Sequence, residues 1–496
     1  MADSLLILLK PSVLVPWLLG MAFGVFLGAT PGLTATMGVA LVVPLSFYLP
    51  PDAGLALIIG VSFTAIFAGD IPATWLRIPG TPASAAATLD SHALARQGRG
   101  DFALRLDLVC SCLGGLLGVL LLAWLSPLLA RGAIRFSDYE YFWLGVLGLS
   151  LAAAVSVGST FRGLLAGVGG VLLSTVGLDM VSGRARFTFG MSELTAGLSF
   201  IPAMIGLFGL SEVLREVAKG PWQAAASQVP KSATGWSEVL RTVVRRRWLI
   251  LRSSLLGTLI GALPGAGADI AAWCAYGLAQ RTSRQSQTFG HGSEEGVLAP
   301  TSANNAAVAG AWIPALVLGI PGDSVTAIVL GALLMYHIRP GPLIFEQQAE
   351  QVRHLLWIAA GTQLLLLPVG YLGIRAFSWM LRLPRAAILA GVVVFCVLGS
   401  FAVNNRLWDV GVMIAFGLLG VLLEAWRVPL GPLILGMILG PLVEEKLRVG
   451  LIKSEGHLAP FFTRPLSLAL VGLLLAAWLA PLVLRRLLRP SGTFAR

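Results

Sequence analysis

Long apolar runs follow one another along the whole chain. In the first half they cover about 13–29, 34–49, 54–69, 106–129, 141–157, 163–178 and 194–214. In the second half they cover about 248–263, 266–279, 304–335, 354–377, 386–403, 408–424, 430–443 and 466–484. The polar stretches 89–105 and 280–302 are predicted to be loops. A crossing takes about 20 residues, and a membrane barrel would show short alternating segments instead. The pattern therefore predicts an all-α polytopic membrane protein with about 10 to 12 crossings plus broken or re-entrant helical hairpins.

Pro-Gly pairs interrupt this apolar sequence at matching places in the two halves. G-V-F-L-G-A-T-P-G begins at Gly24 and G-T-L-I-G-A-L-P-G at Gly257, an offset of 233 positions. I-P-A-T-W-L-R-I-P-G begins at Ile71 and I-P-A-L-V-L-G-I-P-G at Ile313, an offset of 242. Two ordered matches with nine extra residues between them indicate duplication. The predicted units are a first repeat over 1–218 with breaks at 31–32 and 79–80, a basic linker over 219–247, and a second repeat over 248–496 with breaks at 264–265 and 321–322. Transporter precedent favours inverted repeats.

The physical effect of a Pro-Gly pair is to end a helix, because proline lacks an N–H donor and glycine adopts conformations closed to other residues. At membrane depth the freed backbone groups need protein or a water-filled cavity around them. Matched interruptions in two halves are the sequence pattern of a transporter's binding site. We therefore predict that the breaks form the substrate site, and that one repeat moves against the other to alternate access.

Composition supports a membrane protein and argues against a soluble catalytic domain. Hydrophobic residues make up 56% of the 496 positions and charged residues only 12%, which is too little polar surface for soluble domains. The net charge is +11, but the basic residues are spread over short loops, so nucleic acid is not an expected partner. The positive-inside rule places the central loop and the C-terminal tail in the cytoplasm. Their basic residues are Lys219, Lys231, Arg241, Arg245, Arg246 and Arg247 in the loop, and Arg485, Arg486, Arg489 and Arg496 in the tail.

Two further features bear on processing and on cofactors. The start of the chain lacks a small-residue cleavage site, so its apolar run is predicted to be a retained helix and not a signal peptide. The four cysteines indicate neither a disulfide framework nor a metal site. No cofactor is expected apart from a coupling ion, Na⁺ or H⁺.

Small hydroxylated or acidic residues follow each break. Such side chains accept hydrogen bonds from the free N–H groups of a helix start, so each break can begin a capped half-helix. The remaining donors and the helix dipole then suit a carboxylate, while the unwound side offers oxygen ligands for Na⁺. Taken singly, each hydroxyl more often bonds its own helix. The substrate-binding candidates are Pro31, Gly32, Thr34, Thr36, Arg77, Gly80, Thr81, Ser84, Gly265, Gly267, Asn304, Asn305, Gly322, Ser324 and Thr326.

Charged residues beside the breaks are functional candidates because a charge within the membrane is costly. The forked cation of Arg77 suits a substrate carboxylate, although Arg77 and Asp70, seven positions apart, can equally neutralise each other. Asp70, Asp269 and Asp323 are candidates for binding the coupling cation, and the last two can instead cap helices.

These same residues carry a resemblance to a known family. G-A-L-P-G-A-G-A from Gly261, S-A-N-N-A-A from Ser302, L-G-I-P-G-D-S-V-T-A from Leu318 and I-P-G-T-P-A-S from Ile78 resemble the large membrane subunit of tripartite tricarboxylate transporters. The resemblance covers nearly the whole chain. It implies a secondary transporter in a bacterial inner membrane that works with a periplasmic solute-binding protein and a small membrane subunit. It also implies uptake of organic carboxylates, such as citrate, driven by a Na⁺ or H⁺ gradient.

The chain departs from the family pattern close to the breaks. Asp70 and Arg77 stand where a small hydroxylated residue and an uncharged polar residue are expected. Asp269 replaces the usual threonine, and Thr301-Ser302 stand where an acidic residue often accompanies serine. These differences concern the substrate and the coupling ion rather than the fold.

Two other classes of function remain as alternatives. An intramembrane aspartyl enzyme needs two carboxylates close enough to share a proton, and Asp70 and Asp269 are the candidate pair. The duplication does not place them at equivalent positions, because Asp70 precedes its break and Asp269 follows one. A channel would show flux without saturation and without dependence on a binding protein.

Overall fold

A computed structural model describes residues 8, 10–155, 159–179, 182–219, 235–380 and 382–487. It confirms the all-α class of a polytopic membrane protein, since most of these residues are helical and their one sheet is a ribbon of two two-residue strands. Six helices within these ranges are long and apolar enough to span a membrane, and shorter apolar helices accompany them. The N-terminal residues before 8, Lys231, and the tail with Arg489 and Arg496 lie outside the described ranges, so the predictions made for them stay predictions.

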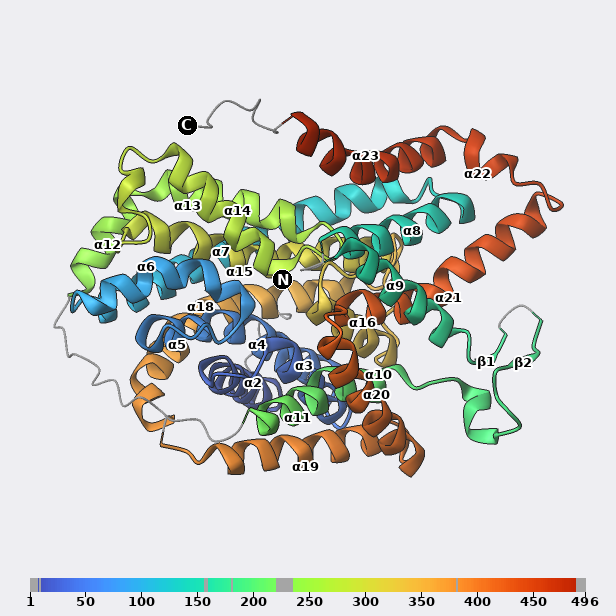
Figure 1. Cartoon of the computed structure of the whole chain (residues 1–496), viewed down its shortest axis with the longest axis horizontal. Coiled ribbons are helices and arrows are strands. Elements are labelled where there is room, and N and C mark those ends of the chain that lie inside the picture. The colour runs from blue at the N-terminus through green and yellow to red at the C-terminus, as the bar shows by residue number, and fades with distance from the viewer. Residues whose placement is uncertain are drawn as a thin grey trace, which may run out of the picture. The chain divides into compact units, whose positions relative to one another are not determined.

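The chain forms two compact units, each assembled from separate stretches of sequence (Figure 1). Unit 1 comprises 1–134 and 198–426, and unit 2 comprises 135–197 and 427–496. The elements of unit 1 are α2 (Pro11–Ala29), α3 (Ala35–Ser46), α4 (Pro51–Ala68), α5 (Asp70–Leu76), the 3-10 turn η1 (Pro82–Ser84), α6 (Ala85–Arg96), α7 (Gly100–Ala133), α10 (Phe200–Met204), the π-helical turn η3 (Ile205–Leu210), α11 (Ser211–Ala218), α12 (Trp236–Arg245), α13 (Arg247–Gly261), α14 (Gly267–Thr282), η4 (Ser286–Thr288), α15 (Glu294–Leu318), α16 (Ser324–Met335), α17 (Ile344–Gln347), α18 (Ala349–Met380), α19 (Arg385–Asn404) and α20 (Leu407–Ala425). Those of unit 2 are α8 (Asp138–Val155), α9 (Thr160–Ser174), β1 (Gly177–Leu178), β2 (Ala185–Arg186), the 3-10 turn η2 (Ser192–Ala196), α21 (Leu430–Lys453), α22 (Ala459–Thr463) and α23 (Pro465–Leu487).

Both stretches predicted to be polar loops are wrong in part. The stretch 89–105 lies within α6 and the start of α7, and α15 begins at Glu294, ten residues earlier than the predicted span from Asn304. The reason in both cases is a buried carboxylate: Asp90 accepts hydrogen bonds from the N–H groups of Gly290, Gly292 and Ser293 and from the hydroxyl of Tyr276. Around Asp90 the polar residues therefore form an internal hydrogen-bond network, whereas others in these segments, such as Arg96 and Arg281, are exposed.

Two other segments also differ from the expected pattern. The run 194–214, predicted as one span, is a 3-10 turn, a short α-helix and a π-helical turn that continues into α11. The glycines Gly206 and Gly209 lie in the π-helical turn, and a Cβ on Gly206 would meet the Met413 carbonyl oxygen at 2.2 Å. Part of the predicted linker is also helical, because α12 begins at Trp236.

Glycines at equivalent positions set the closest helix crossings of the two motif-bearing pairs. A Cβ on Gly28 would lie 2.3 Å from the Ala65 carbonyl oxygen, so α2 and α4 pack backbone to backbone. A Cβ on Gly261 would lie 2.2 Å from the Ala307 carbonyl oxygen at the crossing of α13 and α15. These residues obey the sequence offsets, 233 from Gly28 to Gly261 and 242 from Ala65 to Ala307. Small residues of this kind allow close packing in membrane helices.

The helix α4 with its continuation α5 runs from what we call the Asp52 end of unit 1 to its Arg99 end. At the start of α4, the Asp52 carboxylate oxygen Oδ1 lies 3.0 Å from Nδ1 of His354, at the beginning of α18. At its finish, the ring of Trp75 lies against Gly100. The 26 residues from Pro51 to Leu76 make a helix of about 39 Å, so these two ends are far apart.

The equivalent helix α15 runs the other way. It begins at the Arg99 end, where Glu294 lies 3.3 Å from the Arg99 guanidinium. It finishes toward the Asp52 end, where the Leu316 carbonyl accepts from the N–H of Gly341 in the loop that leads to α18. The motif-bearing helices of the two halves are thus antiparallel within unit 1.

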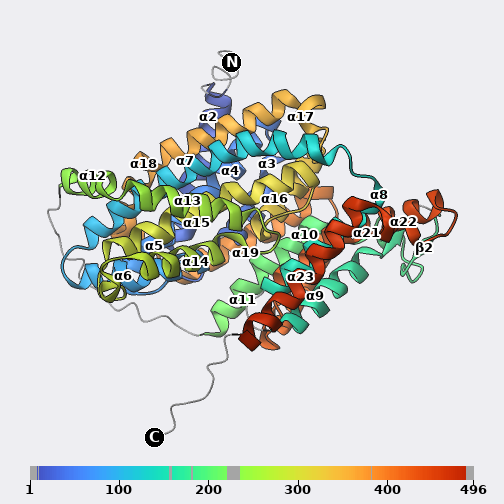
Figure 2. The ribbon, with the colours of Figure 1, turned by 90° about the horizontal axis from the view of Figure 1, so that it is seen from above.

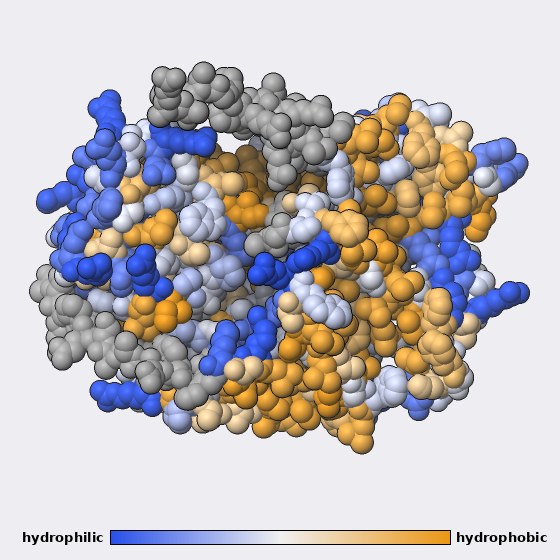
Figure 3. All heavy atoms as spheres, in the orientation of Figure 1, coloured by the Kyte–Doolittle hydropathy of each residue, from blue (hydrophilic) through white to orange (hydrophobic). Residues whose placement is uncertain are grey.

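The helices that precede the breaks enter from opposite ends and turn back. The Tyr336 hydroxyl donates to the Ser46 carbonyl at the end of α3. The chain therefore enters through α2 from the Asp52 end and returns to that end through α3. Arg252 donates to Thr282, which joins the outer parts of α13 and α14 near the Arg99 end. The helices α13, α14 and α15 lie side by side (Figure 2). Hydrophilic residues gather on the surface over α12 and α6, at the left of the view in Figure 3.

Candidate functional site

The second break of each half folds back onto the crossing of the helices described above. The Gly80 N–H donates to the Gly69 carbonyl over 3.0 Å, and a Cβ on Gly80 would lie 2.1 Å from the Gly28 carbonyl oxygen. In the second half, a Cβ on Gly322 would lie 2.6 Å from both the Ala311 Cα and the Gly261 carbonyl oxygen. No side chain fits at either place without movement of backbone. Both predicted glycines thus lie where only a glycine allows the break to pack.

After two of the breaks a side chain caps the helix that follows, whereas Thr81 and Ser84 make no cap hydrogen bond. The Thr34 hydroxyl accepts from the Met37 N–H and begins α3. Asp323 forms a capping box with Thr326 at the start of α16. The equivalent pair in the first half is Thr81 and Ser84, whose hydroxyls lie 2.9 Å apart. These contacts are the local bonds expected of such residues, and they hold the half-helix starts in place.

The tip of the α13–α14 hairpin and the break before α16 form one cluster in the second half. The Gly265 N–H donates to the Gly322 carbonyl over 2.7 Å, so the two breaks of this half are in direct contact. Gly265 and Gly267 have φ angles of +81° and +60°, which favour glycine. The Asp323 and Asp269 side chains interact electrostatically, and the Asp269 side chain is exposed.

The turn after the Gly80 break also contacts two helices of the second half. The turn η1, which follows the Gly80 break, packs against both α14 and α15. There the Asp70 carboxylate faces Ser84 and Asn304, one residue from each half. The Asn305 side-chain amide donates to the side-chain oxygen Oδ1 of Asn304 over 3.0 Å. The structure therefore brings together the predicted residues Asp70, Gly80, Thr81, Ser84, Asn304 and Asn305.

In this cluster, no positive charge among the described residues balances the carboxylate of Asp70. The side chain is 1% exposed, and neither carboxylate oxygen has a well-formed hydrogen bond to any described residue. The Asn304 side-chain nitrogen and the Asn305 side-chain oxygen are equally buried and unpartnered. A buried polar group without a partner is unusual and points to a water, an ion or a ligand at that place.

Asp107 of α7 is the functional candidate that the sequence analysis missed. It is 2% exposed, interacts electrostatically with Asp70, and accepts from Ser111 through one oxygen while the other has no partner within the described residues. Two buried carboxylates that repel each other in apolar surroundings cannot both keep a bare negative charge. The sequence did hold a signal, because Asp107 is an acidic residue inside the apolar run 106–129.

Arg77 and the break at 31–32 lie elsewhere. Arg77 ends α5 in the left-handed conformation, with φ of +58°, and its side chain is exposed. No ion pair joins Arg77 to Asp70, so neutralisation of one by the other is wrong for this structure. Gly32, with φ of +89°, lies against the Glu216 carboxylate of α11. Thr36 and Ser324 occupy the first turns of α3 and α16.

The aspartyl pair of the enzyme alternative is not formed either. The acidic neighbour of Asp70 is Asp107, and that of Asp269 is Asp323. No group of three or more His, Cys, Asp or Glu side chains is placed to hold a metal ion within the ranges described.

Fold and site together define a class: a multi-pass helical membrane protein whose interrupted helices converge on buried, uncompensated polar groups. The chain belongs to the tripartite tricarboxylate transporter TctA family, whose family model matches residues 14–435. It is accordingly a subunit of a tripartite tricarboxylate transporter.

Two relatives from Agrobacterium vitis support the assignment. A protein described as an "uncharacterized 52.8 kDa protein in TAR-I ttuC' 3'region" is 34% identical over 471 residues, which cover 94% of this chain and 93% of the relative. A protein of the TAR-II ttuC' 3'region is 37% identical over 220 residues, which cover 44% of this chain and 90% of the relative. No solved structure matches the chain.

Proposed function

We propose that this chain is the transport pathway of a cation-coupled importer of tri- or dicarboxylates such as citrate. In this proposal a periplasmic solute-binding protein delivers the acid, a small membrane subunit completes the complex, and the complex lies in the bacterial inner membrane. The coupling ion is Na⁺ or H⁺. The observation that carries the proposal is the packing of the turn after the Gly80 break against α14 and α15 of the second half, with the buried, unbalanced carboxylates Asp70 and Asp107 nearby.

The antiparallel course of α4 and α15 supports inverted repeats as the basis of alternating access. Inverted repeats let one arrangement open to either side of the membrane when one repeat moves against the other. The contacts between equivalent glycines, Gly28 with Gly80 and Gly261 with Gly322, would act as the packing surfaces within each repeat.

The roles of the clustered groups follow from their charge. The carboxylate substrate would bind to N–H groups and hydroxyls at the half-helix starts, with Thr81, Ser84 and Thr326 as donors. The coupling cation would bind at Asp70 and Asp107, with the Asn305 oxygen as a further ligand, because the pair needs a positive charge in apolar surroundings. Asp269 and Asp323 form a second acidic pair at the hairpin tip and are a second candidate for the cation.

The test is uptake of a panel of radiolabelled carboxylates into proteoliposomes that contain this chain and its small partner. Each acid is measured with and without the binding protein, under an imposed Na⁺ or proton gradient. We expect saturable, gradient-driven uptake that requires the binding protein. Uptake that rises linearly with substrate and ignores the binding protein would instead identify a channel.

Asp70→Asn and Asp107→Asn test the coupling site in the same assay. Each variant keeps the shape of the side chain and removes the charge, so gradient-driven uptake should fall to background while exchange of internal for external substrate continues. Asp101→Asn is the matched control, since Asp101 lies on the same helix and pairs with Arg105. Gradient-driven uptake by both pair variants at the wild-type rate would remove Asp70 and Asp107 from the coupling mechanism.

A further inference from the structure

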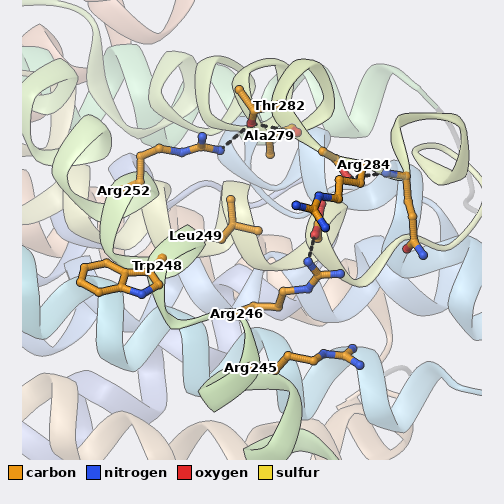
Figure 4. Close-up of a pocket in the computed structure, with 11 residues that line it drawn as sticks. Arg245, Arg246, Trp248, Leu249, Arg252, Ala279, Thr282 and Arg284 are labelled. Atoms are coloured by element: carbon orange, nitrogen blue, oxygen red, sulfur yellow. Dashed lines mark hydrogen bonds and ion pairs between the residues drawn. The ribbon is translucent and has the colours of Figure 1, made fainter.

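A basic pocket lies at the outer part of the α13–α14 hairpin, away from the breaks. It has a volume of about 520 Å³ and is lined by four arginines and a single glutamate (Figure 4). Arg246 and Arg252 come from the start of α13, Arg245 ends α12, and Arg284 follows α14. We call Arg245, Arg246, Arg252 and Arg284 the arginine pocket.

The guanidinium groups of this pocket are only partly used within the protein. Arg246 pairs with Glu295, and Arg252 donates to Thr282 over 2.9 Å. The Nε atoms of both arginines are nevertheless buried and without a hydrogen-bond partner among the described residues. Arg284 makes no ion pair in the part of the chain that the structure describes. Unused, converging guanidinium donors suit a tetrahedral oxyanion, which arginine binds through two parallel hydrogen bonds.

The surface next to the pocket is apolar and exposed. Trp248, which lines the pocket, is 71% exposed. About two and three turns further along α13, Leu255 and Leu259 are 41% and 63% exposed. A basic pocket that adjoins a tryptophan and then exposed leucines reproduces the order of a membrane leaflet, from headgroup to acyl chain. This continuity favours a phosphate carried by a lipid over a free phosphate ion.

We propose that the arginine pocket binds the phosphate of an anionic membrane phospholipid. The phosphate lies between Arg252 on one arm of the hairpin and Arg284 at the end of the other, and the acyl chains lie along Leu255 and Leu259. The lipid holds the two arms of the hairpin together and thereby steadies its tip at Gly265 and Gly267. The site is separate from the transport pathway, and its existence does not depend on which acid or ion is carried.

The experiment uses the purified full chain in nanodiscs of phosphatidylcholine with increasing phosphatidylglycerol. Thermal unfolding gives the apparent lipid affinity, and a parallel series adds inorganic phosphate to pure phosphatidylcholine discs. We expect phosphatidylglycerol to raise Tm and inorganic phosphate to leave it unchanged. In the double variant R252Q/R284Q the apparent affinity should fall by about 30-fold, roughly fivefold for each arginine near the membrane surface.

R241Q/R281Q is the matched control, because it removes the same charge from exposed positions of α12 and α14 outside the pocket. This control should keep the wild-type affinity for phosphatidylglycerol. An equal loss of affinity in both double variants would mean that basic residues attract the anionic lipid without a specific site, and would overturn the proposal. A Tm shift with inorganic phosphate equal to that with phosphatidylglycerol would overturn the lipid as its ligand. If R252Q/R284Q does not fold in phosphatidylcholine, Arg284→Gln alone decides: the exposed side chain has no ion pair to lose, and an unchanged lipid affinity would overturn the proposal.

Discussion

Single glycines decide whether the breaks can pack as they do. Gly80 and Gly322 have ordinary φ angles, so what they supply is space beside a neighbouring backbone. Arg77 shows the opposite situation. It occupies the left-handed C-terminal position of α5, and the equivalent position after α15 is Gly319, with φ of +69°. A non-glycine residue there is strained, and the strain lies beside the break at 79–80.

Replacement of Gly80 by alanine should lower stability by about 1–3 kcal/mol, since the new Cβ would overlap the Gly28 carbonyl and force α2 away. The control is Gly277→Ala on α14, where a Cβ meets nothing within 4 Å; its stability should stay the same or rise, because alanine favours helix. Thermal unfolding of the two purified variants measures the difference. Equal Tm values would mean that the α2 contact does not need glycine.

At the scale of elements, buried carboxylates join segments that lie far apart in the sequence. Asp90 fixes the turn before α15 to α6 through three backbone N–H groups. In unit 2, Glu444 in the C-terminal half of α21 forms a bidentate ion pair with Arg186 of β2, with N–O distances of 2.5 and 3.0 Å. Arg448 adds a 3.2 Å contact to Glu444 and a 2.6 Å contact to Asp179. Ion pairs therefore attach the β1–β2 ribbon to α21, whereas the two-residue strands pair with each other.

This pair makes the stability of unit 2 depend on pH. The hydrogen bond from Arg186 lowers the pKa of Glu444, against a smaller opposite effect of burial, and Arg448 lowers it further. The stabilisation is therefore complete above the ordinary pKa of a glutamate and is lost as the pH falls through the lowered pKa. Glu444→Gln should lower the free energy of unfolding by about 1–2 kcal/mol at neutral pH, with the difference from wild type vanishing in acid.

Urea unfolding at several pH values measures this effect. Glu445→Gln is the matched control, because the Glu445 side chain is 46% exposed and its one ion pair among the described residues is with Lys446. Its loss should cost less than about 0.5 kcal/mol at any pH. A Glu444→Gln difference that persists unchanged in acid would show that the ion pair is not its source.

At the scale of the whole molecule, unit 1 has two chemically distinct ends. The Arg99 end gathers basic residues of α12 and α13 together with Glu238 and Glu294 in ion pairs. The Asp52 end carries the Asp52–His354 contact and the loop with Gly341. The positive-inside rule predicts a cytoplasmic central loop, and from the contacts we propose that the whole Arg99 end lies on that side.

A protease site inserted between Lys219 and Gly235 should be cleaved only in inverted membrane vesicles, and one inserted after Gly341 only from outside intact spheroplasts. The physical reason is that arginines near the membrane remain on the cytoplasmic side. Immunoblots of a tagged chain provide the measurement. Cleavage of both sites from the same side would contradict the antiparallel arrangement of the two halves, and cleavage of each from the opposite side would reverse the assigned orientation.

The sequence by itself determined the membrane class, the positions of the breaks and most spans, because hydropathy and Pro-Gly pairs act locally along the chain. It also pointed to Asp70, Thr81, Ser84 and Asn304, which the structure brings together. It did not reveal that polar segments such as 89–96 are helical, because their polarity is satisfied by partners some 200 positions away. The pairing of Asp70 with Asp107, the exposed position of Arg77 and the arginine pocket were likewise decided only by tertiary structure. Each depends on which side chains distant helices bring into contact, and a linear pattern does not contain that information.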